Sequence, residues 1–283
     1  MLFEGLKGDE VVDSWTIYSV GGGALANEAS RLETPRSIYP LSTISEIKEW
    51  CYHEGKTFWE YVSDCEGPEI WDYLDTVWET MCATIQRGLN NDGVLPGGLK
   101  VARKASTYWV KSKSYTDSLS SRAKIYAYAL ATSEENASGG TVVTAPTCGS
   151  SGVMPAVLYH LSTSRNFLRI RILRALATAG LFGNVAKTNS SISGAEVGCQ
   201  GEVGVACAMA AAAACQLFGG TPSQIEYAAE MGLEHHLGLT CDPVCGLVQV
   251  PCIERNAIAA ARAFDANAYA TLSDGSHMVS FDK

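Results

Sequence analysis

Runs of alanine alternate with loops of glycine, serine, asparagine and cysteine, and this alternation constrains the fold more than any other feature of the sequence. Alanine has the highest helix propensity, so the runs at 208–214 and 257–263 predict buried helices. The segments at 137–152, 183–201 and 238–251 are too rich in glycine and small polar residues to continue those helices. The pattern predicts a mainly α fold, with a large helical domain whose loops bear the functional residues.

Apolar residues recur at helical spacing along most of the chain from Ser42 onward. The helices predicted from this spacing cover residues 42–65, 70–89, 118–135, 153–164, 166–182, 202–217, 222–236 and 252–268. Residues 10–20 instead combine β-branched and aromatic side chains, which predicts a short strand ending at Gly21-Gly22-Gly23. We therefore expect a short β segment and its connection over residues 1–41, followed by a helical domain over residues 42–283.

The composition excludes several classes of function. Of the 283 residues, 47% are hydrophobic and 18% charged, as expected for a chain with a substantial buried core. A net charge of −9 leaves no basic surface for nucleic acid or for an anionic membrane. Residues 203–218, the most apolar stretch, are rich in alanine and too few to span a bilayer. Charged side chains within residues 1–10 do not fit a signal peptide, so we expect a cytoplasmic protein.

The chain has ten cysteines, and their setting favours free thiols over disulfides. A disulfide scaffold is typically short and rich in loops, whereas this chain is long and rich in alanine. Half of the cysteines lie in apolar helical surroundings, where a thiol packs like a small hydrophobic residue. These are Cys51, Cys65, Cys82, Cys207 and Cys215. The other five lie in or beside the glycine-rich loops.

The first of these loops precedes the helix predicted at 153–164. It contains Thr147, Ser150, Ser151 and Gly152. Hydroxyls and free backbone N–H groups at a helix start can bind a carboxylate. The same residues are also ordinary helix caps, so both interpretations stand at this point.

The second loop places small polar residues between apolar helices. It contains Lys187, Asn189, Ser190, Ser193 and Cys199. A solvated linker would more often carry glutamate, lysine and proline, so this composition favours the lining of a polar pocket. Lys187 could orient a carboxylate, or it could be structural.

The third loop and its flanks combine histidine with three cysteines, Cys241, Cys245 and Cys252. His235 and His236 point about 100° apart on a helix, so at most one of them faces a site in the loop. No C-x-x-C pair is present, which argues against a zinc ribbon or finger. Thiolates spread widely along a chain are typical of iron–sulfur clusters, although buried cysteines without a ligand role remain the alternative.

Specific strings of residues recur across the chain. The longest are SISGAEVGCQGE at 191–202, CDPV at 241–244 and PCIERN at 251–256, and shorter ones are YSVGGG at 18–23, GVLPG at 93–97 and TAPT at 144–147. From about Gly8 onward, the sequence resembles the iron–sulfur-dependent L-serine dehydratases of bacteria. The catalytic domain of that family is mainly α-helical, in agreement with the predicted helices.

The resemblance implies that Cys199, Cys241 and Cys252 hold a [4Fe–4S] cluster with one iron open to substrate, while Cys148 and Cys245 lie nearby without binding it. It implies elimination of water from L-serine to give pyruvate and ammonia, without pyridoxal phosphate. The substrate carboxylate and hydroxyl would bind the open iron, aided by the first two loops. His235 or His236 is the candidate for acid–base work, because imidazole titrates near neutral pH.

The sequence departs from this family in two respects. Single-chain members begin with a smaller α/β domain carrying a Ser-Ser-His-Thr motif, of which residues 1–41 resemble only the last part. Members also continue beyond the segment at 276–283. We therefore expect a homo-oligomer or association with a leading-domain chain. The alternatives are a non-catalytic fragment or partner subunit, and a related lyase acting on cysteine or threonine; a zinc-dependent hydrolase is disfavoured.

Overall fold

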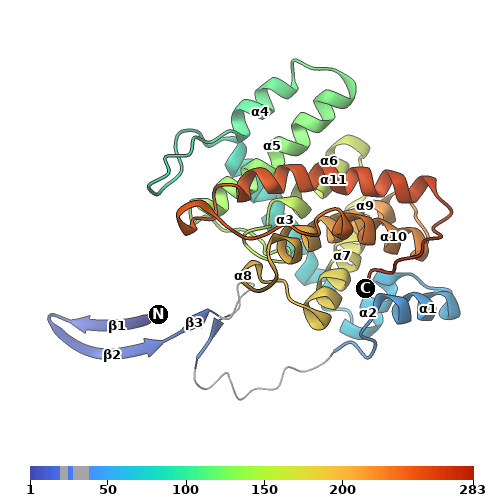
Figure 1. The fold of residues 1–283 in the computed structure, drawn as a ribbon, viewed down its shortest axis with the longest axis horizontal. Helices are drawn as coiled ribbons and strands as arrows, with labels where there is room; N and C mark the ends of the chain where they lie inside the picture. The colour runs from blue at the N-terminus through green and yellow to red at the C-terminus, as the bar shows by residue number, and fades with distance from the viewer. Residues whose placement is uncertain (20–24, 28–37) are drawn as a thin grey trace.

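The computed structural model describes residues 1–19, 25–27 and 38–283, and it begins with β structure. Strands β1 (Leu2–Lys7) and β2 (Glu10–Thr16) form an antiparallel hairpin, and β3 (Tyr18–Ser19) pairs with β4 (Leu25–Ala26). The hairpin projects from the helical body (Figure 1). The strand predicted at 10–20 is confirmed over β2 and β3, β1 was not predicted, and the proposed end at Gly21-Gly22-Gly23 lies outside the described residues.

Helices form the rest of the described chain, which confirms the mainly α fold class. Their bounds are α1 Ile44–Glu54, α2 Phe58–Glu66, α3 Ile70–Leu89, α4 Ala105–Ser112, α5 Asp117–Ala137, α6 Val153–Arg165, α7 Arg169–Asn189, α8 Gly194–Val197, η2 Gln200–Gly204, α9 Val205–Leu217, α10 Pro222–Glu234, η3 Val244–Gly246 and α11 Cys252–Leu272. No helix of the described chain combines the length and the apolar character needed to cross a membrane.

Helix α9 lies at the centre of the core. Its residues from Val205 to Cys215 are all buried, and it packs against α6, α7, α10 and α11. Small side chains let these backbones approach closely: a Cβ on Gly232 of α10 would lie 3.1 Å from the Cα of Ala208. The alanine run therefore serves as a slim axis around which the longer helices pack (Figure 1).

The helix predicted at 42–65 is in fact two helices. Gly55 ends α1 in the left-handed conformation, with φ of 65°, and Thr57 then caps α2 through a capping box with Glu60. A second difference is at α7, which continues to Asn189, so that Lys187 and Asn189 lie on a helix and not in a loop. The short helices α4 and α8 were not predicted.

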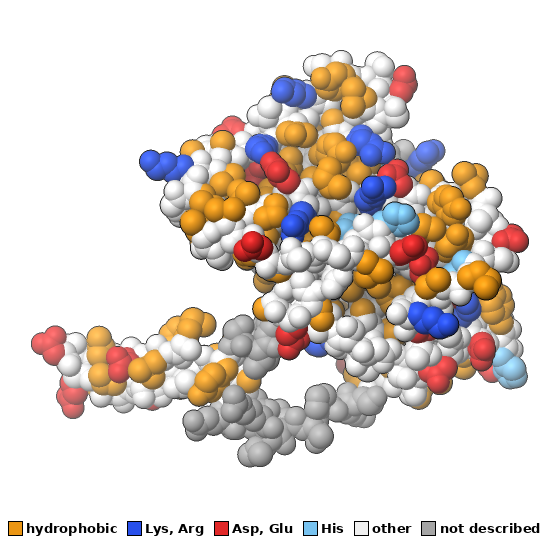
Figure 2. Space-filling view, viewed as in Figure 1, with side chains coloured by type: hydrophobic (Ala, Val, Ile, Leu, Met, Phe, Trp, Pro, Cys, Tyr) orange, Lys and Arg blue, Asp and Glu red, His pale blue; other side chains and the backbone are white. Residues whose placement is uncertain are grey.

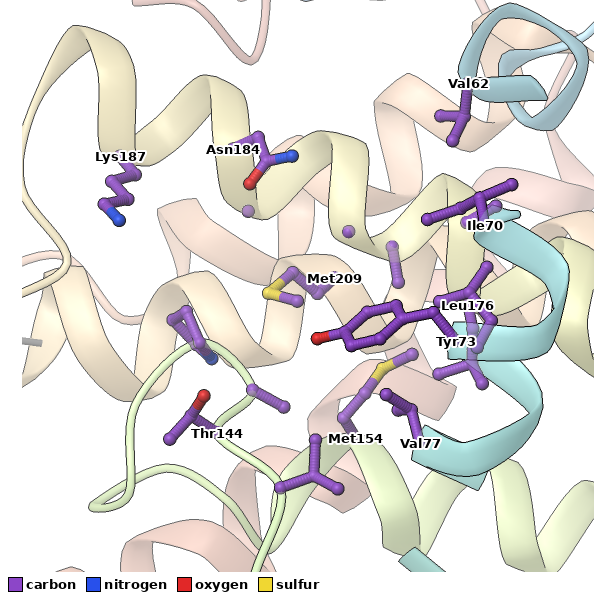
Figure 3. Close-up of a pocket in the computed structure, with 18 of the residues that line it drawn as sticks. Val62, Ile70, Tyr73, Val77, Thr144, Met154, Leu176, Asn184, Lys187 and Met209 are labelled. Carbon is purple, nitrogen blue, oxygen red and sulfur yellow. The ribbon is translucent and has the colours of Figure 1, made fainter. Parts of the chain in front are cut away.

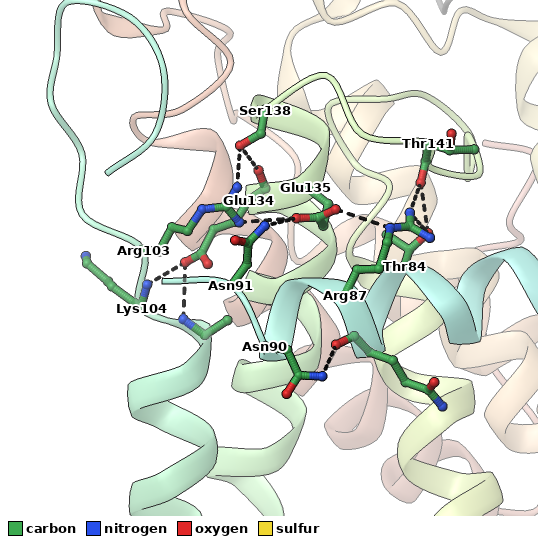
Figure 4. Close-up of polar contacts among 12 residues, drawn as sticks. Thr84, Arg87, Asn90, Asn91, Arg103, Lys104, Glu134, Glu135, Ser138 and Thr141 are labelled. Carbon is green, nitrogen blue, oxygen red and sulfur yellow. Dashed lines mark hydrogen bonds and ion pairs between the residues drawn. The ribbon is translucent and has the colours of Figure 1, made fainter. Parts of the chain in front are cut away.

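Two adjacent glutamates on α5 fix the segment between α3 and α4 (Figure 4). Buried Glu134 accepts hydrogen bonds from the backbone N–H groups of Lys104 and Ala105, at 2.6 and 3.2 Å, and thereby caps α4. Burial raises the pKa of Glu134. The carboxylate of Glu135 receives Arg103 at 3.3 Å and Arg87 at 3.4 Å. These contacts hold the polar turn after α3 against the helical body.

The crossing of α3 and α5 depends on the missing side chain of Gly88. A Cβ at this position would lie 2.3 Å from the carbonyl oxygen of Ala131. We expect Gly88→Ala to lower the free energy of unfolding by about 2 kcal/mol or more, because two helix backbones must separate. Urea denaturation followed by circular dichroism measures the change.

Gly180→Ala is the matched control, since Gly180 lies within α7 and a Cβ there meets no heavy atom within 4 Å. It should stabilise the protein by about 0.5–1 kcal/mol through helix propensity alone. Equal destabilisation by both substitutions would contradict the role assigned to the α3–α5 crossing.

Candidate metal centre

Three thiols distant in sequence lie at the start of helices. Cys199 immediately precedes η2, which leads into α9, and Cys252 is the first residue of α11. Cys241 lies in the segment before η3. The Sγ atoms of Cys199 and Cys241 and a carboxylate oxygen of Glu202 lie within 4.8 Å of one another. Cys252 is near enough for the charges of Cys199, Glu202 and Cys241 to act on its thiol. The structure thus gathers the three predicted cysteine ligands around one carboxylate.

Backbone contacts hold the cysteine-bearing segments together. Gln200 donates its N–H to the carbonyl oxygen of Leu239 at 3.1 Å, and Gly198 lies so close that a Cβ there would be 2.5 Å from the same oxygen. Arg255 donates from Nη1 to the carbonyl oxygen of Thr240 at 2.7 Å, which fixes the residue before Cys241. Close backbone packing, made possible by glycine, therefore positions the thiols.

The thiols are protonated at neutral pH in the metal-free protein. Burial raises the pKa of Cys252 to about 11, and the charge of Cys199 adds to the effect. Burial also raises the pKa of Cys241, again followed by the influence of Cys199. Thiolates, not thiols, bind metals, so a bound cation must displace these protons. Metal affinity at this site is therefore expected to rise with pH.

Glu202 was not predicted as a site residue, although it ends the string in which Cys199 was chosen. The hydroxyl of Thr147 donates to its Oε1 atom. Two glycines make room for the carboxylate: a Cβ on Gly149 would lie 2.5 Å from Oε1, and a Cβ on Gly194 would lie 2.6 Å from Oε2. A carboxylate three positions after a loop cysteine was the only signal in the sequence.

The loop before α6 is joined to α11 by Asn256. Its Oδ1 accepts from the N–H of Gly152 at 2.9 Å, and its Nδ2 donates to the carbonyl oxygens of Gly149 at 2.7 Å and Cys252 at 2.9 Å. The N–H groups of Ser151 and Val153 donate to carbonyl oxygens within the same turn. The expectation of free N–H groups for a carboxylate is therefore wrong at these three residues.

The hydroxyls of this loop differ in their availability. Ser150 bonds internally with Thr147, at 3.1 Å between the two hydroxyl oxygens. Ser151 is fully buried, and its Oγ has no hydrogen-bond partner within the described part of the chain. Buried hydroxyls are normally paired, so Ser151 is a donor available to a bound molecule.

The polar residues predicted in the second loop diverge. Lys187 lines one end of a cavity of about 550 Å³, together with Thr144 and Asn184, while Ile70, Val77 and other apolar side chains line the opposite end (Figure 3). Asn189 donates to the carbonyl oxygen of Ser42 at 2.8 Å and faces away from the thiols.

The two serines that follow α7 also lie in different settings. Ser190 is exposed and lines a separate pocket near Asp282. Ser193 is buried where α8 begins, one residue before the glycine that contacts Glu202. Of the second loop, Ser193 and Cys199 lie nearest the carboxylate of Glu202.

The adjacent histidines separate as their 100° spacing requires. His236 is buried, donates from Nδ1 to the carbonyl oxygen of Gly232 at 2.7 Å, and packs against Gly204 in η2. Burial lowers its pKa below the usual 6.5, so the ring is neutral at pH 7. His235 is exposed and lines a groove with Arg262 and Asp265. Neither ring belongs to the donor group formed by Cys199, Glu202 and Cys241.

The donor set fits an iron–sulfur cluster better than a hard cation. Three thiols dominate it, and sulfur ligands select iron–sulfur clusters and other soft metals. Helices α6, α9 and α11 pack pairwise, and their N-terminal sides meet at the site, where helix dipoles favour thiolates. Cys148 and Cys245 are exposed and lie outside the donor group found in the described residues.

The fold and this donor set define a helical protein with a thiol-rich centre at the ends of its helices. Residues 22–283 match the family model described as serine dehydratase alpha chain. The chain therefore belongs to the serine dehydratase alpha-chain family.

Similar proteins bear the names of complete enzymes. The L-serine dehydratase of Streptomyces coelicolor is 46% identical over 290 residues, covering 98% of this chain and 64% of that protein. L-serine dehydratase 1 of Escherichia coli K12 is 45% identical over 300 residues, covering 100% of this chain and 65% of that protein. The chain thus spans slightly less than two thirds of the length of these curated relatives.

Alkylation of the metal-free protein tests the thiol environment. At pH 8 we expect iodoacetamide to modify exposed Cys148 and Cys245 first and Cys252 last, because the thiol of Cys252 is buried and has a pKa of about 11. Raising the pH to 10 should accelerate modification of Cys252, as its thiolate fraction grows about tenfold per unit below the pKa. Peptide mass spectrometry gives the rates, and equal rates at pH 8 would refute the assignment.

Proposed function

We propose that this chain is the catalytic part of an L-serine dehydratase, with a [4Fe–4S] cluster held by Cys199, Cys241 and Cys252. The observation that carries the proposal is the convergence of these cysteines beside Glu202 and the Thr147 loop. The names of the relatives support L-serine as substrate. When bound by three thiolates, such a cluster supplies a Lewis-acidic iron that accepts oxygen ligands.

The reaction removes the Cα proton and the β-hydroxyl of L-serine. The resulting 2-aminoacrylate tautomerises to an imine, which water hydrolyses to pyruvate and ammonia. Deprotonation needs a base that is neutral at working pH. His236 suits this role better than His235, because burial keeps its ring neutral and it packs against η2, whereas His235 faces a separate groove.

The first loop would receive the substrate's carboxylate through its hydroxyls. Ser151 offers an unpartnered buried Oγ, and Thr147 lies beside Glu202. Ser150 and Gly152 hold the shape of the loop through their own hydrogen bonds. Lys187 would attract anionic substrate at the polar end of the 550 Å³ cavity, two residues of whose wall, Ala145 and Pro146, lead directly to Thr147.

The proposal includes a partner for this chain. The β1–β2 hairpin exposes Leu2, Leu6, Val11 and Trp15, and Figure 2 shows hydrophobic side chains along it. A two-stranded hairpin is only marginally stable by itself, so we propose that a second copy or a leading-domain chain covers this surface. The ten free cysteines fit a reducing cytoplasm.

Anaerobic reconstitution tests the cluster assignment. We expect about four iron and four sulfide per chain, and loss of most of both in Cys199→Ser, Cys241→Ser and Cys252→Ser, because each removes one thiolate. Pyruvate release from L-serine, measured beside release of the corresponding oxo acids from L-threonine and L-cysteine, then identifies the preferred substrate.

Cys215→Ser is the matched control, because Cys215 is buried in α9 and should leave the iron content unchanged. Wild-type protein that binds no iron under any reducing condition would refute the proposed function. A loaded protein that releases pyruvate only after a leading-domain chain is added would support the proposed partner.

A further inference from the structure

The carboxylate of Glu202 has a prepared position but no cationic partner. Thr147 donates to Oε1, while Gly149 and Gly194 leave the space that its two oxygens occupy. No lysine, arginine or histidine of the described chain forms an ion pair with it at 4 Å or less. Arg255, the nearby cation, instead directs its guanidinium to the carbonyl oxygen of Thr240.

The charges around Glu202 make this vacancy for a cation more significant. Its carboxylate lies among Cys199 and Cys241, which become anionic when they bind metal. A partly buried carboxylate beside thiolates is stabilised by a positive group, and anionic groups are repelled from the same place. A bound molecule should therefore direct its cationic end toward Glu202.

We propose that Glu202 binds the α-ammonium group of the amino-acid substrate. This inference rests on the proposed function, since it takes L-serine as the substrate. With the carboxylate and hydroxyl of L-serine directed to the metal and to the loop hydroxyls, the ammonium group is the remaining polar group. Glu202 then distinguishes an amino acid from a hydroxy acid that lacks nitrogen, and it fixes which face of Cα is presented to a base.

Glu202→Gln preserves the shape of the side chain and removes its charge. We expect the KM for L-serine to rise at least about 30-fold with a much smaller change in kcat, because a charge-assisted contact to substrate is lost. Binding of 3-hydroxypropanoate, which has the carboxylate and hydroxyl but no ammonium group, should be unchanged or tighter. Steady-state kinetics gives KM, and anaerobic calorimetry gives the affinity for both compounds.

Glu254→Gln is the matched control, because Glu254 is exposed and pairs with Lys104 on the surface. It should leave KM and analogue binding unchanged. Glu202→Asp, which keeps the charge on a shorter side chain, should restore part of the affinity for L-serine. Iron and sulfide content and the electron paramagnetic resonance spectrum of the reduced cluster should match those of wild-type protein in all three variants.

Two results would overturn the inference while leaving the proposed function intact. A changed cluster spectrum in Glu202→Gln would make the carboxylate a metal ligand. A fall in kcat of about 100-fold or more at unchanged KM would place it in proton transfer. Failure of the wild-type protein to bind iron or L-serine would be a failure of the proposed function instead, and is seen before any variant is made.

Discussion

The close packing of α9 against its neighbours is the constraint on which the site depends. Because its buried positions are filled mainly by alanine, α6, α10 and α11 approach its backbone closely. Side chains of ordinary size would separate these helices and, with them, the segments at their starts. Cys199 precedes the η2–α9 unit, Cys252 begins α11, and the Thr147 loop precedes α6. The separation of the helices thus sets the distances between groups that are far apart in sequence.

Asn256 transmits this packing to the site. Its amide contacts Gly149, Gly152 and Cys252, and so it links the first turn of α11 to the loop before α6. Each of its polar atoms at this buried position has a partner, which gives the loop a single arrangement. The loop in turn presents Thr147 to Glu202. Shape therefore passes from the core to the carboxylate through hydrogen bonds to backbone atoms.

The sequence predicted much of the helical fold because apolar periodicity reports burial directly. The bounds of α3 were predicted correctly, since apolar spacing and the breakers after Leu89 agree. Helix α4 was missed because few of its side chains are buried and its start is capped by Glu134, thirty residues later in the chain. The extension of α7 was missed because Lys187 and Asn189 have the composition of a loop. Only tertiary contacts decide these segments.

The site was harder to predict than the fold. Spacing alone could not select Cys199, Cys241 and Cys252 from ten cysteines, because their proximity arises from the packing of α9 and α11. Glu202 was missed for a related reason: the glycines that make room for it, Gly149 and Gly194, come from other loops. Local patterns identify residue chemistry, whereas the fold determines which residues meet.

The burial of the remaining thiols divides the cysteines by their fate in air. Burial raises the pKa of Cys51 to about 12 and also raises that of Cys207, and both side chains are shielded from solvent. Cys148, Cys241 and Cys245 are exposed. Oxidants therefore attack the loops around the site while the core remains reduced, and the helical scaffold outlasts its reactive centre. An aerobically inactivated molecule would keep its fold and could be repaired by reductant, iron and sulfide without refolding.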